Sequence, residues 1–323
     1  MRLAPILAAG ALLLAAAPAA QAFGTINGLG QNAEHEKITR LALRCGGSLS
    51  DRDCFGPRTL DVLAGKRGTF GMVGGPDSGS LLLQSSAHCD NGDWLDVPGY
   101  PQTREKAQAA LEACRDWMRT SIETAATRAG DVLDEAGALR PRQVGGDCAR
   151  FGGDQPSAKC KALEAFGATL HAAQDFYAHS NWVDRPNPGP TGPDNPPGLG
   201  HDGPAPWLDW RTGAAFPAGL ISDCFGGSPE RLFCNYANTF RAKHAFINKD
   251  TGSIDPVREH TGAGTSPRGM INGNFQRAVA AARDETRVKW ATLKGLLVER
   301  YGAERGARIA CVLRNDDPAK ACR

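Results

Sequence analysis

Hydrophobic residues recur every three or four positions in five stretches of the chain, which is the period of an amphipathic α-helix. These stretches are residues 34–44, 103–136, 158–182, 234–248 and 275–301. Alternating patterns typical of β-strands are scarce. The sequence therefore predicts a mainly α fold in which several helices pack together.

Two segments interrupt the helical pattern. Residues 45–100 are rich in Gly, Pro, Asp and Ser, and residues 185–206 are dense in Pro and Gly. Both are expected to be mostly irregular. The second segment could be a linker between two cores, but the helical stretches on either side resemble halves of one bundle. We therefore expect a single multi-helix domain over residues 23–323, with long loops.

Composition narrows the class of protein further. The 323 residues include 37 basic and 35 acidic side chains, which gives a formal net charge of +2. Hydrophobic residues make up 41% and charged residues 22%, which excludes a disordered chain, a coiled coil and a collagen-like fibre. The balanced charge argues against a protein that holds nucleic acid by bulk electrostatics, and no specific nucleic-acid partner is indicated.

The first 22 residues have the features of a secretory signal peptide. Arg2 precedes an Ala-rich apolar run, and Ala20-Gln21-Ala22 matches a small-x-small cleavage site. The alternative is a membrane anchor, but the apolar run is short and is interrupted by prolines. We expect cleavage before Phe23 and a secreted protein, extracellular or periplasmic.

The ten cysteines agree with export, because an even number in an exported chain favours a disulfide framework. Pairing each cysteine with its near neighbour predicts five local disulfides that pin the loops. Zinc ligation by cysteine is the alternative, but the chain has no Cys-x-x-Cys pair. The predicted pairs are Cys45–Cys54, Cys89–Cys114, Cys148–Cys160, Cys224–Cys234 and Cys311–Cys322.

Histidine is rare in this chain, and three of its candidate metal ligands follow a helical register. His171, Asp175 and His179 are each four residues apart, so they lie in a row on one helix face that is about 12 Å long. Imidazole and carboxylate groups bind zinc, and the row has room for one ion at one end or for more ions bridged by Asp175. The alternative is a set of ordinary ion pairs on a helix surface.

The other histidines are weaker signals when taken singly. His35 begins a predicted helix, His88 lies in SSAHCDN, and His244 is followed by Asn248 and Asp250. Each alone is more often a surface or satisfied core residue than a ligand. His201 and His260 lie in Gly-rich loops and are expected to face solvent.

Taken in order, these residues resemble the zinc-dependent phospholipase C and single-strand nuclease superfamily. The closer likeness is to its secreted CinY-type and Het-C-like proteins. The resemblance extends over residues 23 to about 290. The phrases that carry it are EHEKITRLAL, SSAHCDN, LHAAQDFYAHSNW and HAFINKDTG.

The resemblance implies an α-helical fold with two to three zinc ions. One ion would be bound by His88, His171, Asp175 and an upstream aspartate, for which Asp77 is the first choice and Asp61 the reserve. A second ion would share Asp175 and would be bound by His35 and by the freed α-amine and carbonyl of Phe23. His179 and His244 would bind the third.

Three features of the sequence depart from the family pattern. The mature chain would begin with Phe23 instead of Trp, which matters little because the ligands there are backbone atoms. The histidine after His-x-x-x-Asp comes four residues later instead of six. Asn248 replaces the expected Glu after His244; either Asp250 substitutes for it, or the third ion is weak or absent.

The implied chemistry is hydrolysis of a phosphodiester, because clustered zinc ions activate water and neutralise charge on phosphoryl oxygens. Asp77 or Asp90 would act as the general base. A phospholipid substrate is favoured over nucleic acid. The alternative is an exported, non-catalytic binding module that metal ions and disulfides only stabilise.

An aromatic loop offers a possible peripheral contact with a membrane. Trp207, Trp210 and Phe216 follow the Pro-rich segment and would form a lid or an interfacial contact with lipid. The favoured interpretation, however, is that the tryptophans are buried and anchor the loop to the rest of the fold.

Overall fold

The computed structural model describes residues 23–28, 30–47, 53–66, 68–225, 234 and 240–322. The predicted signal peptide lies outside these residues. The described chain is mainly α, as the hydrophobic pattern predicts. Its principal helices are α1 (Glu34–Leu43), α2 (Pro57–Ala64), α4 (Arg104–Ala129), α5 (Ala158–His179), α9 (Asn274–Tyr301) and α10 (Ala303–Arg314).

Shorter elements connect these helices. The one-turn helices are α3 (Ser85–His88), α7 (His244–Ile247), α8 (Pro267–Met270) and α11 (Pro318–Ala321), and the 3₁₀ turns include η1 (Gly75–Asp77) and η2 (Gly79–Leu83). Two antiparallel ribbons pair β1 (Asn27–Gly28) with β2 (Gln31–Asn32) and β3 (Gly252–Asp255) with β4 (His260–Gly264). Strand is therefore a minor part of the described fold.

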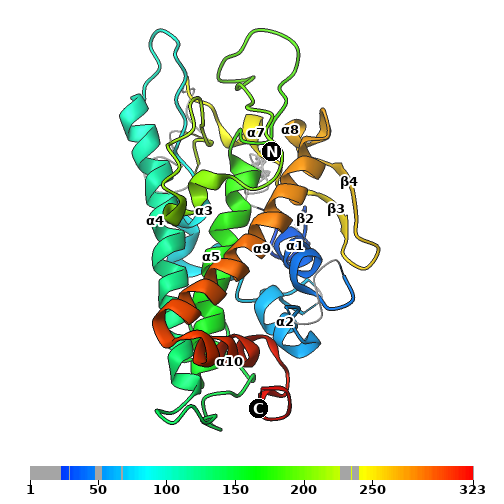
Figure 1. Ribbon diagram of the computed structural model, residues 1–323. Helices are drawn as coiled ribbons and strands as arrows, with labels where there is room; N and C mark the ends of the chain where they lie inside the picture. The colour runs from blue at the N-terminus through cyan, green and yellow to red at the C-terminus, as the bar shows by residue number, and fades with distance from the viewer. Residues whose placement is uncertain are drawn as a thin grey trace, which may run out of the picture.

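Helix α5 is the centre of the molecule. All of its residues except Lys161 and Glu164 are buried, because apolar and small residues cover every face of the helix. Figure 1 shows α5 running between α4 and α9, which both pack against it. Ser157 caps its first turn by accepting a hydrogen bond from the amide of Cys160.

Two apolar clusters meet along α5. Phe166 belongs to a cluster with Phe55 and Trp290 near the α10 end of the molecule. Phe176 belongs to a second cluster, with Phe23 and Phe275. The row of candidate ligands on α5 therefore lies within the second half of the helix, where its polar groups are enclosed by apolar packing.

The five predicted disulfides are confirmed. Each cysteine pairs with its near neighbour, and no free cysteine remains. Five disulfides indicate an oxidising, extracellular-type compartment. None of the helices within the described ranges has both the length and the apolar character that a membrane span requires.

The helix predicted over 234–248 is confirmed only in part. Cys234 and His244–Ile247 are helical, whereas residues 240–243 are not; residues 235–239 lie outside the described residues. The amide of Cys224 donates to the carbonyl of Ala242 at 2.8 Å. This pairing with a distant segment replaces the local hydrogen bonds that a helix would need.

Two of the principal helices were missed by the sequence pattern. Helix α2 lies inside the segment expected to be loop, and its first amides are capped from far away, because Asp316 accepts from Arg58 and Thr59. Helix α10 follows directly after α9, which ends at Gly302 with φ +81°. The predicted helix 103–136 stops at Ala129.

Candidate metal centre

The first cluster consists of five buried side chains from four elements: His35 of α1, Asp77 of η1, His88 of α3, and His171 and Asp175 of α5. Asp175 is at its centre. One carboxylate oxygen lies 2.9 Å from His171 Nε2 and 3.0 Å from His88 Nδ1. The other lies 3.1 Å from His35 Nε2, so one carboxylate faces three imidazoles.

Asp77 is the second carboxylate of this first cluster. Its Oδ1 lies 3.7 Å from His171 Nε2 and 3.9 Å from His88 Nδ1. The hydroxyl of Thr25 donates to its other oxygen, which leaves Oδ1 toward the imidazoles. Asp61, the reserve candidate, lies elsewhere and accepts a hydrogen bond from Arg40 at 2.7 Å.

Each imidazole of the first cluster is held by a hydrogen bond at the ring nitrogen that points away from the centre of the cluster. His171 Nδ1 pairs with the carbonyl of Val73 at 2.8 Å, and His35 Nδ1 pairs with Gln174 Oε1 at 2.8 Å. His88 is turned the other way, since its Nε2 pairs with the carbonyl of Leu81 at 3.1 Å. In each ring the second nitrogen faces the common centre, as in metal-binding histidines.

The second cluster lies at the end of α5 and consists of His179, Asp223, His244 and Asp250. Asp250 lies between the two imidazoles, 2.7 Å from His244 Nε2 and 3.4 Å from His179 Nε2. Asp223 accepts a hydrogen bond from His244 Nδ1. This cluster adjoins the first, because His179 Nδ1 lies 3.0 Å from the carbonyl of His88.

Asp90, proposed from the sequence as a general base, contacts His179. Its Oδ1 lies 2.7 Å from His179 Nδ1, which turns His179 Nε2 toward Asp250. Asn248 lies outside the cluster and donates to the carbonyl of His244. Asp250, which the sequence offered as the ligand in place of Asn248, faces the imidazoles of His179 and His244.

Asp223 was missed by sequence reasoning. No histidine lies three or four residues from Asp223, and its neighbour Cys224 indicates only a disulfide. A backbone hydrogen bond places Asp223 beside the end of α5, because its amide donates to the carbonyl of His179 at 3.1 Å. No local sequence signal reports this contact between distant segments.

The carboxylates and imidazoles of both clusters shift each other's pKa values. Burial alone lowers the pKa of His88, but its bond to Asp175 and the charges of Asp175 and Asp77 outweigh burial and raise that pKa to about 9. Burial likewise opposes protonation of His244, yet Asp250 and Asp223 raise its pKa to about 9. Concentrated negative charge thus favours a cation at each cluster.

Several atoms that face these centres are buried without a hydrogen bond. In the first cluster these are His35 Nε2 and Asp175 Oδ1, which are close but not aligned for hydrogen bonding. In the second they include His179 Nε2, Asp223 Oδ1 and Asp250 Oδ1. Buried polar atoms are costly when unpaired, so these nitrogen and oxygen donors fit divalent metal ions. Within the described part of the chain, three groups have donor atoms close enough to hold an ion: His35, Asp77 and His171; His88, His171 and Asp175; and His179, Asp223 and His244.

The remaining residues singled out by the sequence have other roles. Phe23 is buried, and its ring lies 6.0 Å from that of His35, so the predicted first residue of the mature chain is next to the first cluster. Trp207 is buried against Phe216, which agrees with anchoring of the loop. His201 and His260 are exposed.

Comparison with known proteins gives no family. No protein-family model matches the chain, and neither a curated protein nor a solved structure was found to match it. The fold and the donor set are therefore the basis for any functional conclusion.

Proposed function

We propose that this protein is an exported, zinc-dependent phosphodiester hydrolase of the phospholipase C type. The observation that carries this proposal is the pair of adjoining His/Asp clusters on α5. Phosphodiester hydrolysis commonly uses two or more close metal ions, and a row of ligands on one helix that joins two clusters suits such a site.

When bound, zinc ions supply activated water and neutralise charge on phosphoryl oxygens. The chain's own residues prepare the site for them. Gln174 and the carbonyl of Val73 fix the rings of His35 and His171, and Thr25 orients Asp77. Asp90 holds His179 in place, a contact that favours a positioning role; its role as a general base stays a prediction.

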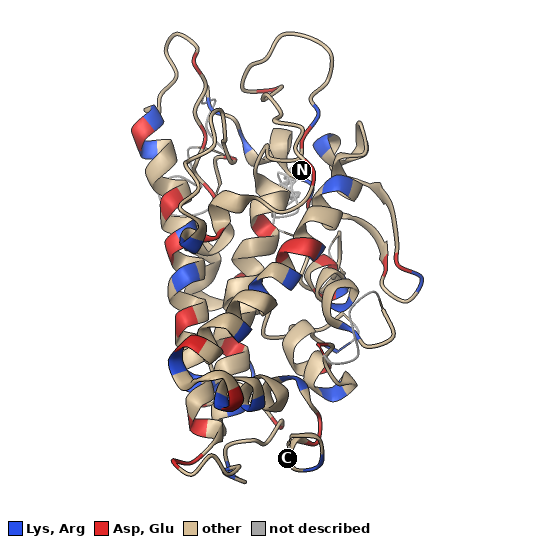
Figure 2. Cartoon of the chain, viewed as in Figure 1, with Lys and Arg blue, Asp and Glu red and all other residues tan. Residues whose placement is uncertain are grey.

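A phospholipid substrate is favoured over nucleic acid on the basis of charge. Figure 2 shows acidic and basic residues interspersed along α4 and α10 instead of forming one basic stripe. The net charge of +2 adds no bulk attraction for a polyanion. The disulfides agree with a protein that meets its substrate outside the cell.

A non-catalytic, metal-stabilised binding module is the second candidate. The observation in its favour is the burial of the ligands, since His35, His171 and Asp175 are each 0% exposed. Closed coordination is typical of structural sites, whereas a catalytic site keeps an open position. Activity measurements separate the two.

The test combines elemental analysis with hydrolysis of a soluble phosphodiester and of phospholipid vesicles. Under the proposal the protein contains two to three zinc ions and hydrolyses phospholipid, and His171→Ala loses the metal of the first cluster together with the activity. The matched control is His260→Ala, an exposed histidine that contacts neither cluster. Zinc without hydrolysis would support the binding module, and activity that survives His171→Ala would overturn the assignment.

A further inference from the structure

A cavity of about 580 Å³ lies beside the segment that supplies Asp77. Asp61, the reserve candidate ligand, lines this cavity, but no residue of the two His/Asp clusters does. Met72, Gly75 and Ser78 of the lining belong to the same stretch of chain as Asp77 and Val73. Its volume falls within the range of small-molecule sites. The cavity is therefore a second candidate binding site, next to the metal centre but separate from it.

The lining is apolar at the floor and cationic at the rim. Val62, Met72 and Phe151 supply apolar surface, and Phe70, with 51% of its surface exposed, extends this surface to the mouth. An exposed aromatic ring at the mouth of an apolar cavity gains from being covered by an apolar ligand.

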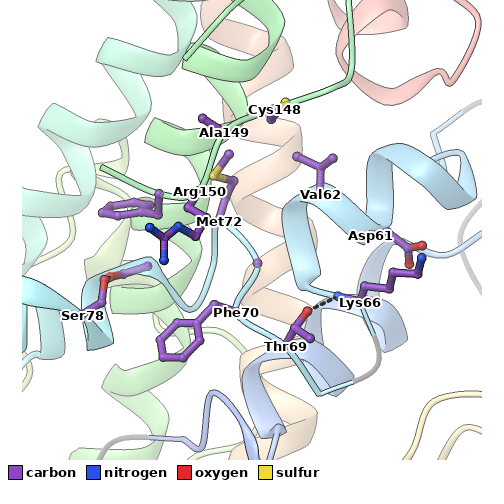
Figure 3. Close-up of a pocket in the computed structure, with 13 residues that line it drawn as sticks. Asp61, Val62, Lys66, Thr69, Phe70, Met72, Ser78, Cys148, Ala149 and Arg150 are labelled. Carbon is purple, nitrogen blue, oxygen red and sulfur yellow. Dashed lines mark hydrogen bonds between the residues drawn. The ribbon is translucent and has the colours of Figure 1, made fainter. Parts of the chain in front are cut away.

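Lys66 and Arg150 provide the cationic groups, and they come from different walls of the cavity (Figure 3). Among the residues that the structure describes, neither forms an ion pair. The one carboxylate of the lining, Asp61, is already paired with Arg40 at 2.7 Å. The rim thus has positive charge available for an anionic ligand.

Covalent and hydrogen-bonded restraints hold both walls of the cavity. The disulfide Cys148–Cys160 ties the loop of Arg150 to α5, and Gln155 donates to the carbonyls of Ala149 and Arg150. On the other wall the amide of Lys66 donates to Thr69 Oγ1 at 2.8 Å. The site is pre-formed, which limits the entropy lost on binding.

We propose that this cavity binds a single-chain amphiphile with an anionic head group. Its chain lies against Val62, Phe70 and Met72, and its head group lies between Lys66 and Arg150. The proposal goes beyond the hydrolase function and does not depend on it, because binding is measured without any reaction.

Calorimetric titration of the purified protein tests this with four probes: decanoate, decyl phosphate, decanol and inorganic phosphate. We expect both charged decyl compounds to bind at one site per chain, and the tighter of the two identifies carboxylate or phosphate as the head group. Shortening decanoate to octanoate should weaken binding about fourfold per methylene. Absence of binding, or equally tight binding of decanol, would overturn the proposal.

Variants locate the site. Ala149→Trp fills the cavity and should abolish binding, while Lys66→Gln with Arg150→Gln should weaken binding about tenfold and reduce its dependence on salt. Lys106→Gln, an exposed lysine outside the cavity, is the matched control for charge. The double variant of Lys66 and Arg150 alters only exposed residues. It therefore tests whether the ligand binds in this cavity even if Ala149→Trp does not fold.

His171→Ala separates this site from the metal centre. The affinity of this variant for decyl phosphate should equal that of the unmodified protein, because the substitution alters no residue that lines the cavity. Binding that vanishes in His171→Ala but persists in Ala149→Trp would place the ligand at the metal centre and refute the cavity site, whatever the outcome of the hydrolysis assay.

Discussion

Asp175 illustrates how one residue can organise a polar centre inside an apolar core. Burial alone would raise its pKa, but the charges of His171 and His35 outweigh this and lower that pKa well below its usual range. The carboxylate therefore stays ionised while fully buried, which requires positive partners on both of its oxygens. A single ion pair would satisfy one carboxylate oxygen of Asp175. Cations bound between Asp175 and its histidines would satisfy both oxygens.

The first prediction concerns Gln174, which is expected to position His35 for metal binding. Its Oε1 pairs with His35, and its amide nitrogen donates to Thr39 and Thr286 at 3.0 and 3.1 Å. Gln174→Met removes the orienting bond and should weaken zinc binding about 10- to 100-fold. Competition with a chromophoric chelator measures this affinity.

The matched variant is Gln174→Glu, whose carboxylate can still accept from His35 Nδ1. It should retain most of the zinc affinity that Gln174→Met loses. Equal affinity in Gln174→Met and in the unmodified protein would show that the ring of His35 needs no such support.

At the scale of elements, the sequence predicted what local periodicity controls and missed what distant contacts control. Helix α5 and the row of His171, Asp175 and His179 along it were predicted from spacing alone. Helix α2 was missed because Asp316 caps it from the other end of the chain, and Asp223 was missed because its place depends on pairing with the end of α5. The disulfides were predicted because all five close short loops.

The second prediction concerns the close approach of α5 and the segment of Met72. A Cβ at Gly167 would lie 2.4 Å from the carbonyl carbon of Met72. Helix propensity alone favours Ala over Gly by about 1 kcal/mol, but this contact should make Gly167→Ala destabilising by about 1–3 kcal/mol. Chemical denaturation measures the change in the free energy of unfolding.

Gly295 in α9 is the control, because a Cβ there would lie no closer than 3.5 Å to Arg211. Gly295→Ala should therefore be stabilising. If both substitutions stabilise the protein, the tight packing of α5 against Met72 is refuted.

The third prediction concerns Lys159, a buried lysine that connects α5 with two other elements. Its ammonium donates to Thr59 Oγ1 at 3.1 Å and to the carbonyl of Asn315 at 2.6 Å. Burial lowers its pKa to about 8, although Asp316 opposes the shift. Between that value and its ordinary pKa near 10.5, the unfolded chain holds the proton that the folded chain has lost.

Stability should therefore rise with pH in this window, because deprotonation favours the folded state. Relative to Lys159→Met, the free energy of unfolding of the unmodified protein should increase by up to about 3 kcal/mol between pH 7 and pH 10. Urea titrations at several pH values provide the measurement. A difference that stays constant with pH would mean that Lys159 keeps an ordinary pKa.

At the scale of the whole molecule, the two clusters join segments that are far apart in the sequence. His35, Asp77 and His171 come from α1, η1 and α5, and Asp223 and His244 come from the later part of the chain. The disulfides join near neighbours only, the widest being Cys89–Cys114. Distant parts of the described fold are thus joined by noncovalent contacts, and these polar centres are among them.

The fourth prediction is that metal removal destabilises the entire fold. An ion bound only by the folded chain stabilises it by mass action, by about 4 kcal/mol per site when its free concentration is about 1,000 times Kd. A strong chelator should therefore lower the Tm markedly, and added zinc should restore it. Differential scanning calorimetry with the disulfides intact isolates this contribution from that of the covalent links.

His171→Ala makes this test specific to the first cluster. The variant should begin with a lower Tm and respond less to the chelator, because its remaining response comes from the second cluster alone. His260→Ala should behave like the unmodified protein. A Tm that the chelator leaves unchanged would mean that protonated imidazoles satisfy the buried carboxylates without a metal, in which case Asp175 and Asp250 form structural ion-pair networks and the hydrolase proposal fails with them.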